Sequence, residues 1–167
     1  MFIRIIFALT LLLTTLFSAE IDIHAKLMPR IVLQSSLANQ SDSINIAIAY
    51  TPKLVYRAVK LKKLIATSVK GRVINTTLLD VTKNYSLKNF QALYLSDLDG
   101  KIIDELIKKS KENKIITFGK DLKQFKKGAI FFIESKRKIN IYLNTKFAND
   151  ANIGFNPSLL KYVKHHD

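Results

Sequence analysis

The stretch that decides the fold extends from Ala92 to Gly119 and reads ALYLSDLDGKIIDELIKKSKENKIITFG. Its first residues, 92–96, form an apolar run closed by a serine, which is typical of a short buried strand. Leu98 then opens a series of apolar residues at spacings of three and four, which predicts an amphipathic helix. Residues 114–118 are predicted to form a second strand, ended by Gly119. A strand, a helix and a strand in this order predict a βαβ unit with parallel strands.

An earlier segment repeats this order. In Ile44–Tyr50, isoleucines alternate with small or polar residues, which predicts a strand whose second face packs closely against a helix. Pro52 suits the first turn of that helix, with Thr51 before it as the cap. Gly71 ends the unit, and Val73–Val81 is predicted to be the next strand.

Both ends of the chain add further elements. In chain order, these are a helix over Asp22–Gln34, a loop over Ser35–Ser43, a β-hairpin of Ala129–Glu134 with Ile139–Leu143, and helical pieces at Thr145–Ala151 and Pro157–Val163. Alternating strands and helices followed by a hairpin predict a three-layer α/β fold. Its sheet is mostly parallel, with an antiparallel edge from the hairpin and with terminal helices.

Residues 1–19 have the order of a secretory signal peptide. Arg4 supplies the positive charge, Ile5–Phe17 is uncharged, and Ser18 and Ala19 precede Glu20. A helix over this uncharged run is only about 20 Å long, short of the ~30 Å hydrocarbon core. Cleavage after Ala19 would place bulky Phe17 at the −3 position, so an uncleaved N-terminal tether is the alternative. We predict export to the periplasm and one domain over residues 20–167.

The composition excludes some kinds of catalysis and indicates which kinds of partner the chain could bind. The chain has no cysteine, which excludes thiol catalysis and disulfide switching. Its formal net charge is +14, which indicates an acidic protein partner, an anionic membrane surface or nucleic acid. Export argues against nucleic acid. Compositional bias is a further explanation, because lysine, isoleucine and asparagine are all abundant.

The sequence lacks the common catalytic and cofactor motifs. Five glycines form no phosphate-binding loop, and no nucleophile elbow is present. His24 is near the predicted mature N-terminus, whereas His165 and His166 are expected to be solvated tail residues. With no histidine expected inside the fold, the prediction is a protein that is not an enzyme and holds neither a cofactor nor a metal.

Three predicted parallel strands end in residues that could contact a ligand, because ligands of open α/β sheets bind beyond these ends. The candidates are Tyr50 with Thr51, Ser96 with Asp97, and Gly119 with Lys120. Asp97 and Asp99 could also hold a cation or exchange protons, but capping of the following helix is the favoured explanation. The hairpin turn supplies a second candidate, a cationic docking tip of Lys136, Arg137 and Lys138.

From Ala92 onward the chain resembles the YfiR-like family of periplasmic regulatory proteins. The matching segments are LYLS at 93–96, IITFG at 115–119, Phe125 with Gly128, AIFFIE at 129–134, INIYLN at 139–144 and PSLLK at 157–161. The resemblance implies a Rossmann-like or flavodoxin-like sheet without nucleotide binding. It also implies a periplasmic regulator that binds the sensor domain of an inner-membrane signalling protein, often a diguanylate cyclase.

The leading hypothesis is therefore a non-enzymatic regulator that docks on an inner-membrane receptor, a diguanylate cyclase or sensor kinase, and biases its activity. A homodimer and a peripheral contact with an anionic membrane surface are further associations to test. The alternative is a periplasmic small-molecule-binding module that serves a sensor or a transporter. An envelope enzyme is the least favoured hypothesis, because no acid, base and nucleophile are grouped in the sequence.

Overall fold

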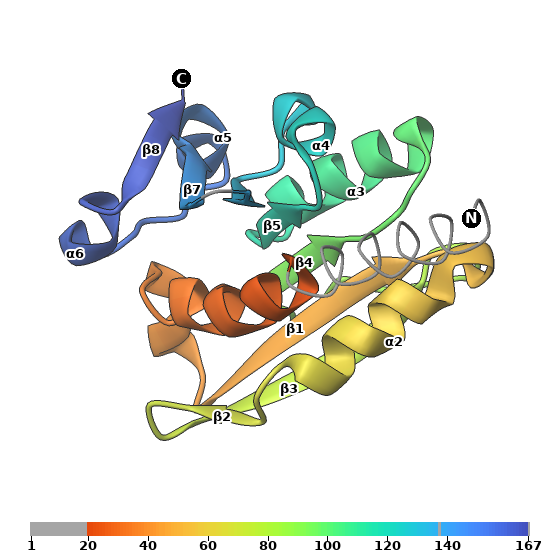
Figure 1. Ribbon diagram of the computed structural model, residues 1–167, viewed down its shortest axis with the longest axis horizontal. Coiled ribbons are helices and arrows are strands. Elements are labelled where there is room, and N and C mark those ends of the chain that lie inside the picture. Colours follow the sequence, from red (N-terminus) through yellow and green to blue (C-terminus); the bar gives the residue numbers. More distant parts are fainter. Residues whose placement is uncertain (1–19, 137, 167) are drawn as a thin grey trace, which may run out of the picture.

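The computed structural model describes residues 20–136 and 138–166, so the predicted signal peptide over 1–19 lies outside the described residues. Eight strands form one sheet in the order β2-β3-β1-β4-β5-β6-β7-β8 (Figure 1). The strands are β1 Ser43–Tyr50, β2 Ser68–Val69, β3 Arg72–Asp80, β4 Ala92–Leu95, β5 Ile116–Gly119, β6 Phe131–Ser135, β7 Ile139–Asn144 and β8 Val163–His166.

Helices accompany the sheet throughout the described chain. A helix over residues 20–32, here named the N-terminal helix, precedes η1 Ser36–Gln40, η2 Pro52–Leu54, α2 Val55–Leu64, α3 Gly100–Glu112, α4 Leu122–Lys127, α5 Thr145–Asp150 and α6 Pro157–Leu160. Among the residues described, no helix combines the length and the apolar character needed to cross a membrane.

The sheet is mostly parallel, as predicted. Strands β3, β1, β4, β5 and β6 pair in parallel, and the hairpin of β6 with β7 is antiparallel. Two further strands complete the edges. Strand β2 pairs antiparallel with β3, and β8 pairs in parallel with β7, so the hairpin is followed by one more strand.

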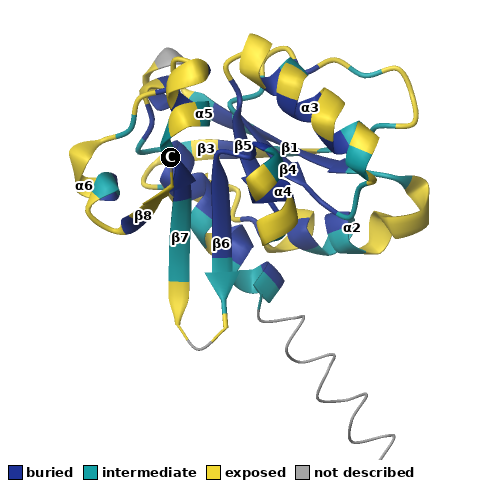
Figure 2. Ribbon diagram, turned by 90° about the horizontal axis from the view of Figure 1, so that it is seen from above, coloured by how far each residue is buried: buried dark blue, intermediate teal, exposed yellow. Residues whose placement is uncertain are grey.

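The central strands are buried on both faces, which Figure 2 shows as dark blue arrows at β1, β4 and β5. Alternate residues along each strand point to opposite faces. In β1, Ile44, Ile46 and Ile48 join a core with the N-terminal helix and α2, whereas Ala47 and Ala49 join a second core with α3. The three predicted layers follow from this division, since each apolar face needs its own helical cover.

Two of the three helix starts for which the sequence predicts a cap have it. The Asp99 carboxylate accepts a hydrogen bond from the Lys101 amide at 3.2 Å, and Asn156 caps α6 ahead of Pro157. The predicted side-chain cap by Thr51 is wrong. The segment from Pro52 is a short 3-10 turn in which the Leu54 amide donates to the Thr51 carbonyl, so the backbone itself closes this turn.

Three other segments differ from their predictions. The expected loop at 35–43 contains η1, and the last predicted helix ends at Leu160, before β8 begins at Val163. Helix α4 was not predicted, because its six residues span too few turns for a clear periodicity. Strand β8 changes the environment of His165 and His166, which are exposed but belong to a paired strand rather than to a solvated tail.

We predict that Ile46→Ala will lower the free energy of unfolding by about 2–5 kcal/mol, because Ile46 is fully buried in the core. Ile139→Ala is the matched control, since the Ile139 side chain is 53% exposed and its truncation should cost below about 1 kcal/mol. Urea unfolding monitored by circular dichroism measures both values. Equal losses in the two variants would contradict the burial of Ile46 in the core.

Candidate functional site

The carboxyl ends of β1, β4 and β5 border a cleft of about 860 Å³, here named the strand-end cleft. It is lined by Thr51, Pro52, Lys53, Leu54, Thr82, Asp97, Leu98, Asp99, Gly100, Ile102, Ile103, Lys120, Asp121, Lys123 and Gln124. Three of the six predicted strand-end residues, Thr51, Asp97 and Lys120, therefore share one cleft. Parallel pairing brings them together, because it places the carboxyl ends of neighbouring strands at one edge.

The other three predicted strand-end residues do not line the cleft. Tyr50 packs against the core on the side of α2. Gly119 is buried, and a Cβ atom there would lie 3.2 Å from the Cβ atoms of Ala129 and Gln124, so this position serves close packing. Ser96 is also buried and faces a smaller hollow.

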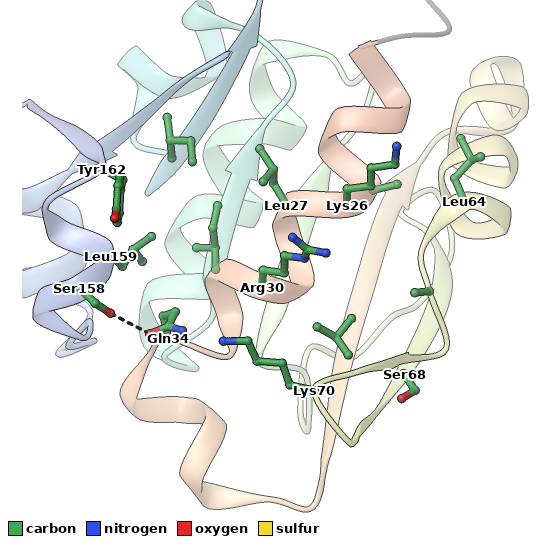
Figure 3. Close-up of a pocket in the computed structure, with 15 residues that line it drawn as sticks. Lys26, Leu27, Arg30, Gln34, Leu64, Ser68, Lys70, Ser158, Leu159 and Tyr162 are labelled. Atoms are coloured by element: carbon green, nitrogen blue, oxygen red, sulfur yellow. Dashed lines mark hydrogen bonds between the residues drawn. The ribbon is translucent and has the colours of Figure 1, made fainter. Parts of the chain in front are cut away.

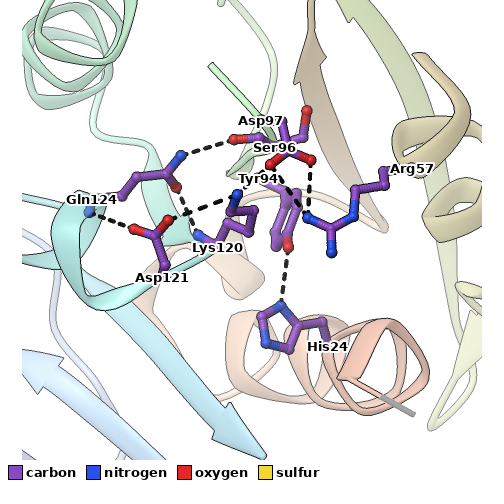
Figure 4. A network of polar contacts seen from close by, with 8 residues as sticks. All are labelled: His24, Arg57, Tyr94, Ser96, Asp97, Lys120, Asp121 and Gln124. Carbon is purple, nitrogen blue, oxygen red and sulfur yellow. Dashed lines mark hydrogen bonds and ion pairs between the residues drawn. The ribbon is translucent and has the colours of Figure 1, made fainter. Parts of the chain in front are cut away.

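Asp97 lines the cleft and is held between two cations (Figure 4). Its Oδ2 atom lies 3.0 Å from Nη1 of Arg57, which comes from α2, and Lys120 at the end of β5 donates to Oδ1. Burial raises the pKa of this carboxyl, but hydrogen bonds and attraction from Lys120 and Arg57 outweigh it and hold the pKa below its ordinary value. Asp97 thus stays ionised and joins α2, β4 and β5.

This arrangement corrects the capping prediction for Asp97, which holds for Asp99 alone. Asp97 does not cap α3, since its two oxygens face Arg57 and Lys120. Across the described parts of the chain, no three carboxylate or histidine side chains come close enough to hold a metal ion.

Gln124 is a second connector that the sequence analysis missed. Its side-chain amide donates to the Ser96 carbonyl at 2.8 Å and accepts from the Lys120 backbone amide at 2.7 Å. The Asp121 carboxylate caps the Gln124 amide at the start of α4. The sequence offered one signal here, an aspartate directly before Leu122. Such an aspartate predicts the start of a helix but not a hydrogen-bonded link between strand ends.

The hydroxyl of Ser96 is buried and has no hydrogen-bond partner among the described residues. It faces a hollow of about 10 Å³ lined also by Arg57, Tyr94, Asp97 and Lys120. Such a volume is about that of one water molecule. Asp97 and Lys120 line this hollow as well as the strand-end cleft, so the ion pair separates the two spaces.

His24 lies inside the fold, contrary to the expectation from sequence. The side chain is 1% exposed, its Nε2 atom lies 2.9 Å from the Ile133 carbonyl, and its Nδ1 atom lies 3.2 Å from the Tyr94 hydroxyl. A carbonyl only accepts, so Nε2 donates and Nδ1 accepts from Tyr94. Burial lowers the pKa of His24, and the bond to Ile133 opposes this only in part. The neutral imidazole thus attaches the N-terminal helix to β4 and β6.

A second hollow, here named the helix groove, runs beside the N-terminal helix and has a volume of about 800 Å³ (Figure 3). Its cations are Lys26, Arg30 and Lys70, and its apolar lining includes Leu64 and Tyr162. Among the described residues, no aspartate or glutamate lines it, and its lining has no residue in common with the strand-end cleft. Residues 43–79 likewise contain no acidic residue.

The hairpin tip is separate from both hollows. The Lys136 ammonium lies 3.0 Å from the Glu134 carboxylate, and Lys138 is exposed. Arg137 lies outside the described residues. Neither Lys136 nor Lys138 lines the cleft or the groove, so a docking role for this tip stays a prediction.

Comparison with known proteins identifies the family and the fold. The YfiR/HmsC-like family model matches residues 34–164. None of the curated proteins compared with the chain matches it. Two solved structures are similar at low identity, so they show the fold alone.

The first similar structure is described as the ABC domain in complex with L-Trp from Streptococcus pneumoniae. It is 10% identical with a TM-score of 0.61, and the match covers 84% of this chain and 59% of that one. The second is a conserved domain protein from Vibrio cholerae O1 biovar El Tor. It is 13% identical with a TM-score of 0.60, and the match covers 88% of this chain and 60% of that one. The chain thus spans about three fifths of the length of either structure.

We predict that Asp97→Asn will lower the free energy of unfolding by about 1–3 kcal/mol, because it leaves Arg57 and Lys120 without their shared anion. Asp99→Asn should change it by less than about 0.5 kcal/mol, since asparagine caps helices as well as aspartate does. Urea unfolding at pH 7 compares the two variants. A larger loss for Asp99→Asn would contradict the roles given to these carboxylates.

We predict that stability falls as the pH drops from about 7.5 to 5.5, because the unfolded chain protonates His24 near pH 6.5 and the folded protein resists it. His24→Gln should be less stable at every pH but should lose this dependence. Tyr94→Phe is the control, since it removes a hydrogen bond but leaves His24 buried, and it should keep the pH dependence. Thermal unfolding midpoints across this pH range test the assignment, which fails if wild type and His24→Gln have the same slope.

Proposed function

The chain belongs to the YfiR/HmsC-like family, and from this membership we propose that it is an exported, non-enzymatic regulator of an inner-membrane signalling protein. The family is one of periplasmic regulators, and its match to residues 34–164 is the observation that carries the proposal. The regulated protein is a diguanylate cyclase or a sensor kinase whose periplasmic sensor domain this chain binds. Stronger binding to one receptor state than to the other then biases the cytoplasmic output.

The helix groove is the docking surface that its chemistry favours. Lys26, Arg30 and Lys70 surround an apolar floor, and Tyr162 beside them is 80% exposed. An acidic, amphipathic segment of the sensor domain complements both properties, because its carboxylates meet the three cations and its apolar face covers Leu64 and Tyr162. The cationic hairpin tip, Lys136 to Lys138, is a secondary contact in this proposal.

A second candidate function is small-molecule binding in the service of a sensor or transporter. The strand-end cleft favours it, since its position beyond the carboxyl ends of parallel strands is where open α/β sheets hold ligands. The similar domain from Streptococcus pneumoniae is described in complex with L-Trp, which illustrates ligand binding by a related fold. The full length of that protein is not matched, so the regulator remains the first proposal.

The test is crosslinking in living cells with a C-terminally tagged chain, followed by mass spectrometry of its partners. Enrichment of one inner-membrane protein with a periplasmic sensor domain is expected. A Lys26→Glu, Arg30→Glu double variant should lower its yield at least about tenfold, because the groove then repels an acidic segment. Lys101→Glu with Lys108→Glu is the matched control, since this pair makes the same charge change on α3, outside the groove.

A crosslinked species with the mass of two copies of the chain and no other protein would identify a homodimer, and recovery of no partner would shift weight to small-molecule binding. Either result contradicts receptor docking. An unchanged yield with the groove variant would keep the receptor but reject the groove as the docking surface.

A further inference from the structure

We propose that the outer side of α2 is a membrane-binding face for anionic phospholipid. This face, here named the outer stripe, consists of Val55, Tyr56, Val59, Lys62 and Lys63. Their spacing of i, i+1, i+4, i+7 and i+8 places the five side chains along one side of the helix over two turns. The stripe contains no residue of the helix groove, so the proposal does not depend on receptor docking.

The apolar half of the outer stripe is not used by the fold. Val55 is 37% exposed, Tyr56 is 74% exposed, and Val59 is half-buried. Among the described residues, none of these three belongs to either apolar core. The buried side of α2 is a different one, formed by Ala58 and Leu61. Helix α2, which lies at the surface of the fold (Figure 1), therefore has a second apolar side that faces solvent.

The charged half of the outer stripe is positive only. The side chains of Lys62 and Lys63 are exposed, and within residues 20–136 and 138–166 neither ammonium group forms an ion pair. The nearby sequence offers no carboxylate, since residues 43–79 contain no aspartate or glutamate. The stripe thus combines exposed apolar side chains with uncompensated cations, and an anionic surface with an apolar interior matches both.

Helix α3 shows how an ordinary solvated helix of this protein differs. Its exposed side chains are all charged and carry both signs: Lys101, Asp104, Glu105, Lys108, Lys111 and Glu112. No large apolar side chain of α3 is exposed. A general abundance of lysine therefore does not account for α2, because it explains neither the exposed apolar residues nor the absence of acidic ones.

The shape of the outer stripe favours a bilayer over a folded protein partner. None of its five residues lines the strand-end cleft, the helix groove or the hollow beside Ser96. Protein partners gain most of their affinity from anchors in well-packed pockets, which this convex surface lacks. A bilayer interface accepts a convex helix, because apolar side chains enter the headgroup region while lysine ammonium groups reach the phosphates. Tyr56 suits this depth, since its ring is apolar and its hydroxyl is polar.

The experiment is flotation of the predicted mature chain, residues 20–167, with lipid vesicles. Vesicles with about one third phosphatidylglycerol in phosphatidylcholine should carry the chain upward at about 0.05 M NaCl and release it at about 0.5 M. Vesicles of phosphatidylcholine alone should bind it at least about tenfold more weakly, because they offer the apolar interior without the net charge.

Variants then locate the contact. Lys62→Gln with Lys63→Gln should weaken binding to phosphatidylglycerol vesicles at least about tenfold, because each lysine at an anionic surface adds to the attraction. Lys101→Gln with Lys108→Gln is the matched control, since it makes the same charge change on α3, which packs against the other core. Tyr56→Ser should weaken binding at least about threefold and leave the fold unchanged, because the side chain belongs to neither core.

A dye provides a second, direct readout of position. The chain has no cysteine, so a single introduced cysteine carries an environment-sensitive dye at one known place. The emission of the dye at Val55→Cys should shift to the blue on binding to phosphatidylglycerol vesicles, since this position enters the interface. The dye at Lys108→Cys, on the exposed side of α3, should show no shift.

Four outcomes overturn the proposal. These are no flotation with phosphatidylglycerol vesicles, equal binding to phosphatidylcholine alone, equal losses in the α2 and α3 lysine variants, and a dye response at residue 108 instead of residue 55. Binding to polyglutamate without binding to vesicles would also overturn it, and would identify a surface for an acidic protein. None of these outcomes bears on receptor docking, which the groove variant tests separately.

Discussion

Burial of the central strands on both faces is the constraint from which the remaining architecture follows. Residues of β1, β4 and β5 alternate between two apolar cores, so helices must cover both sides of the sheet. Helical crossovers make the strand pairing parallel, and parallel pairing gathers the carboxyl ends at one edge. The position of the strand-end cleft therefore follows from the same alternation of residues between the two cores that stabilises the fold.

Polar contacts then fix the positions of helices relative to the strands, which apolar packing alone specifies less strictly. Asp97 holds α2 against the ends of β4 and β5, and Gln124 links the ends of the same two strands to α4. His24 attaches the N-terminal helix to β4 and β6. These contacts are buried or half-buried, where water competes weakly for the partners. The consecutive elements η2 and α2 reach both hollows, because Lys53 and Leu54 of η2 line the cleft and Leu64 at the end of α2 lines the groove.

The sequence predicted the layers, the parallel units, the hairpin and the caps at Asp99 and Asn156, because these depend on local periodicity and on residue types with local roles. It also predicted that Thr51, Asp97 and Lys120 lie at one edge, because each follows the end of a predicted parallel strand. It missed the partners of His24, which lie 70 and 109 residues away, and the pairing of Arg57 with Asp97 across 40 residues. Contacts at such separations depend on tertiary packing, which no local pattern contains. Strand β8 was missed because its four residues show no alternation of apolar and polar side chains. It is a strand only through its pairing with β7.

The two edges of the sheet bear on how the chain avoids aggregation. An open sheet exposes unpaired backbone groups at each edge, and these can recruit a strand from another molecule. Here β2 is only two residues long and is followed by a tight turn with positive φ at Lys70 and Gly71. At the opposite edge, β8 is four residues long and presents the exposed side chains of Lys164, His165 and His166. The two short terminal strands and the charged side chain of Lys164 offer little template for fibre growth. The longer open stretch is residues 75–80 of β3, which pair with β1 but extend beyond β2, so this segment is where another strand would add.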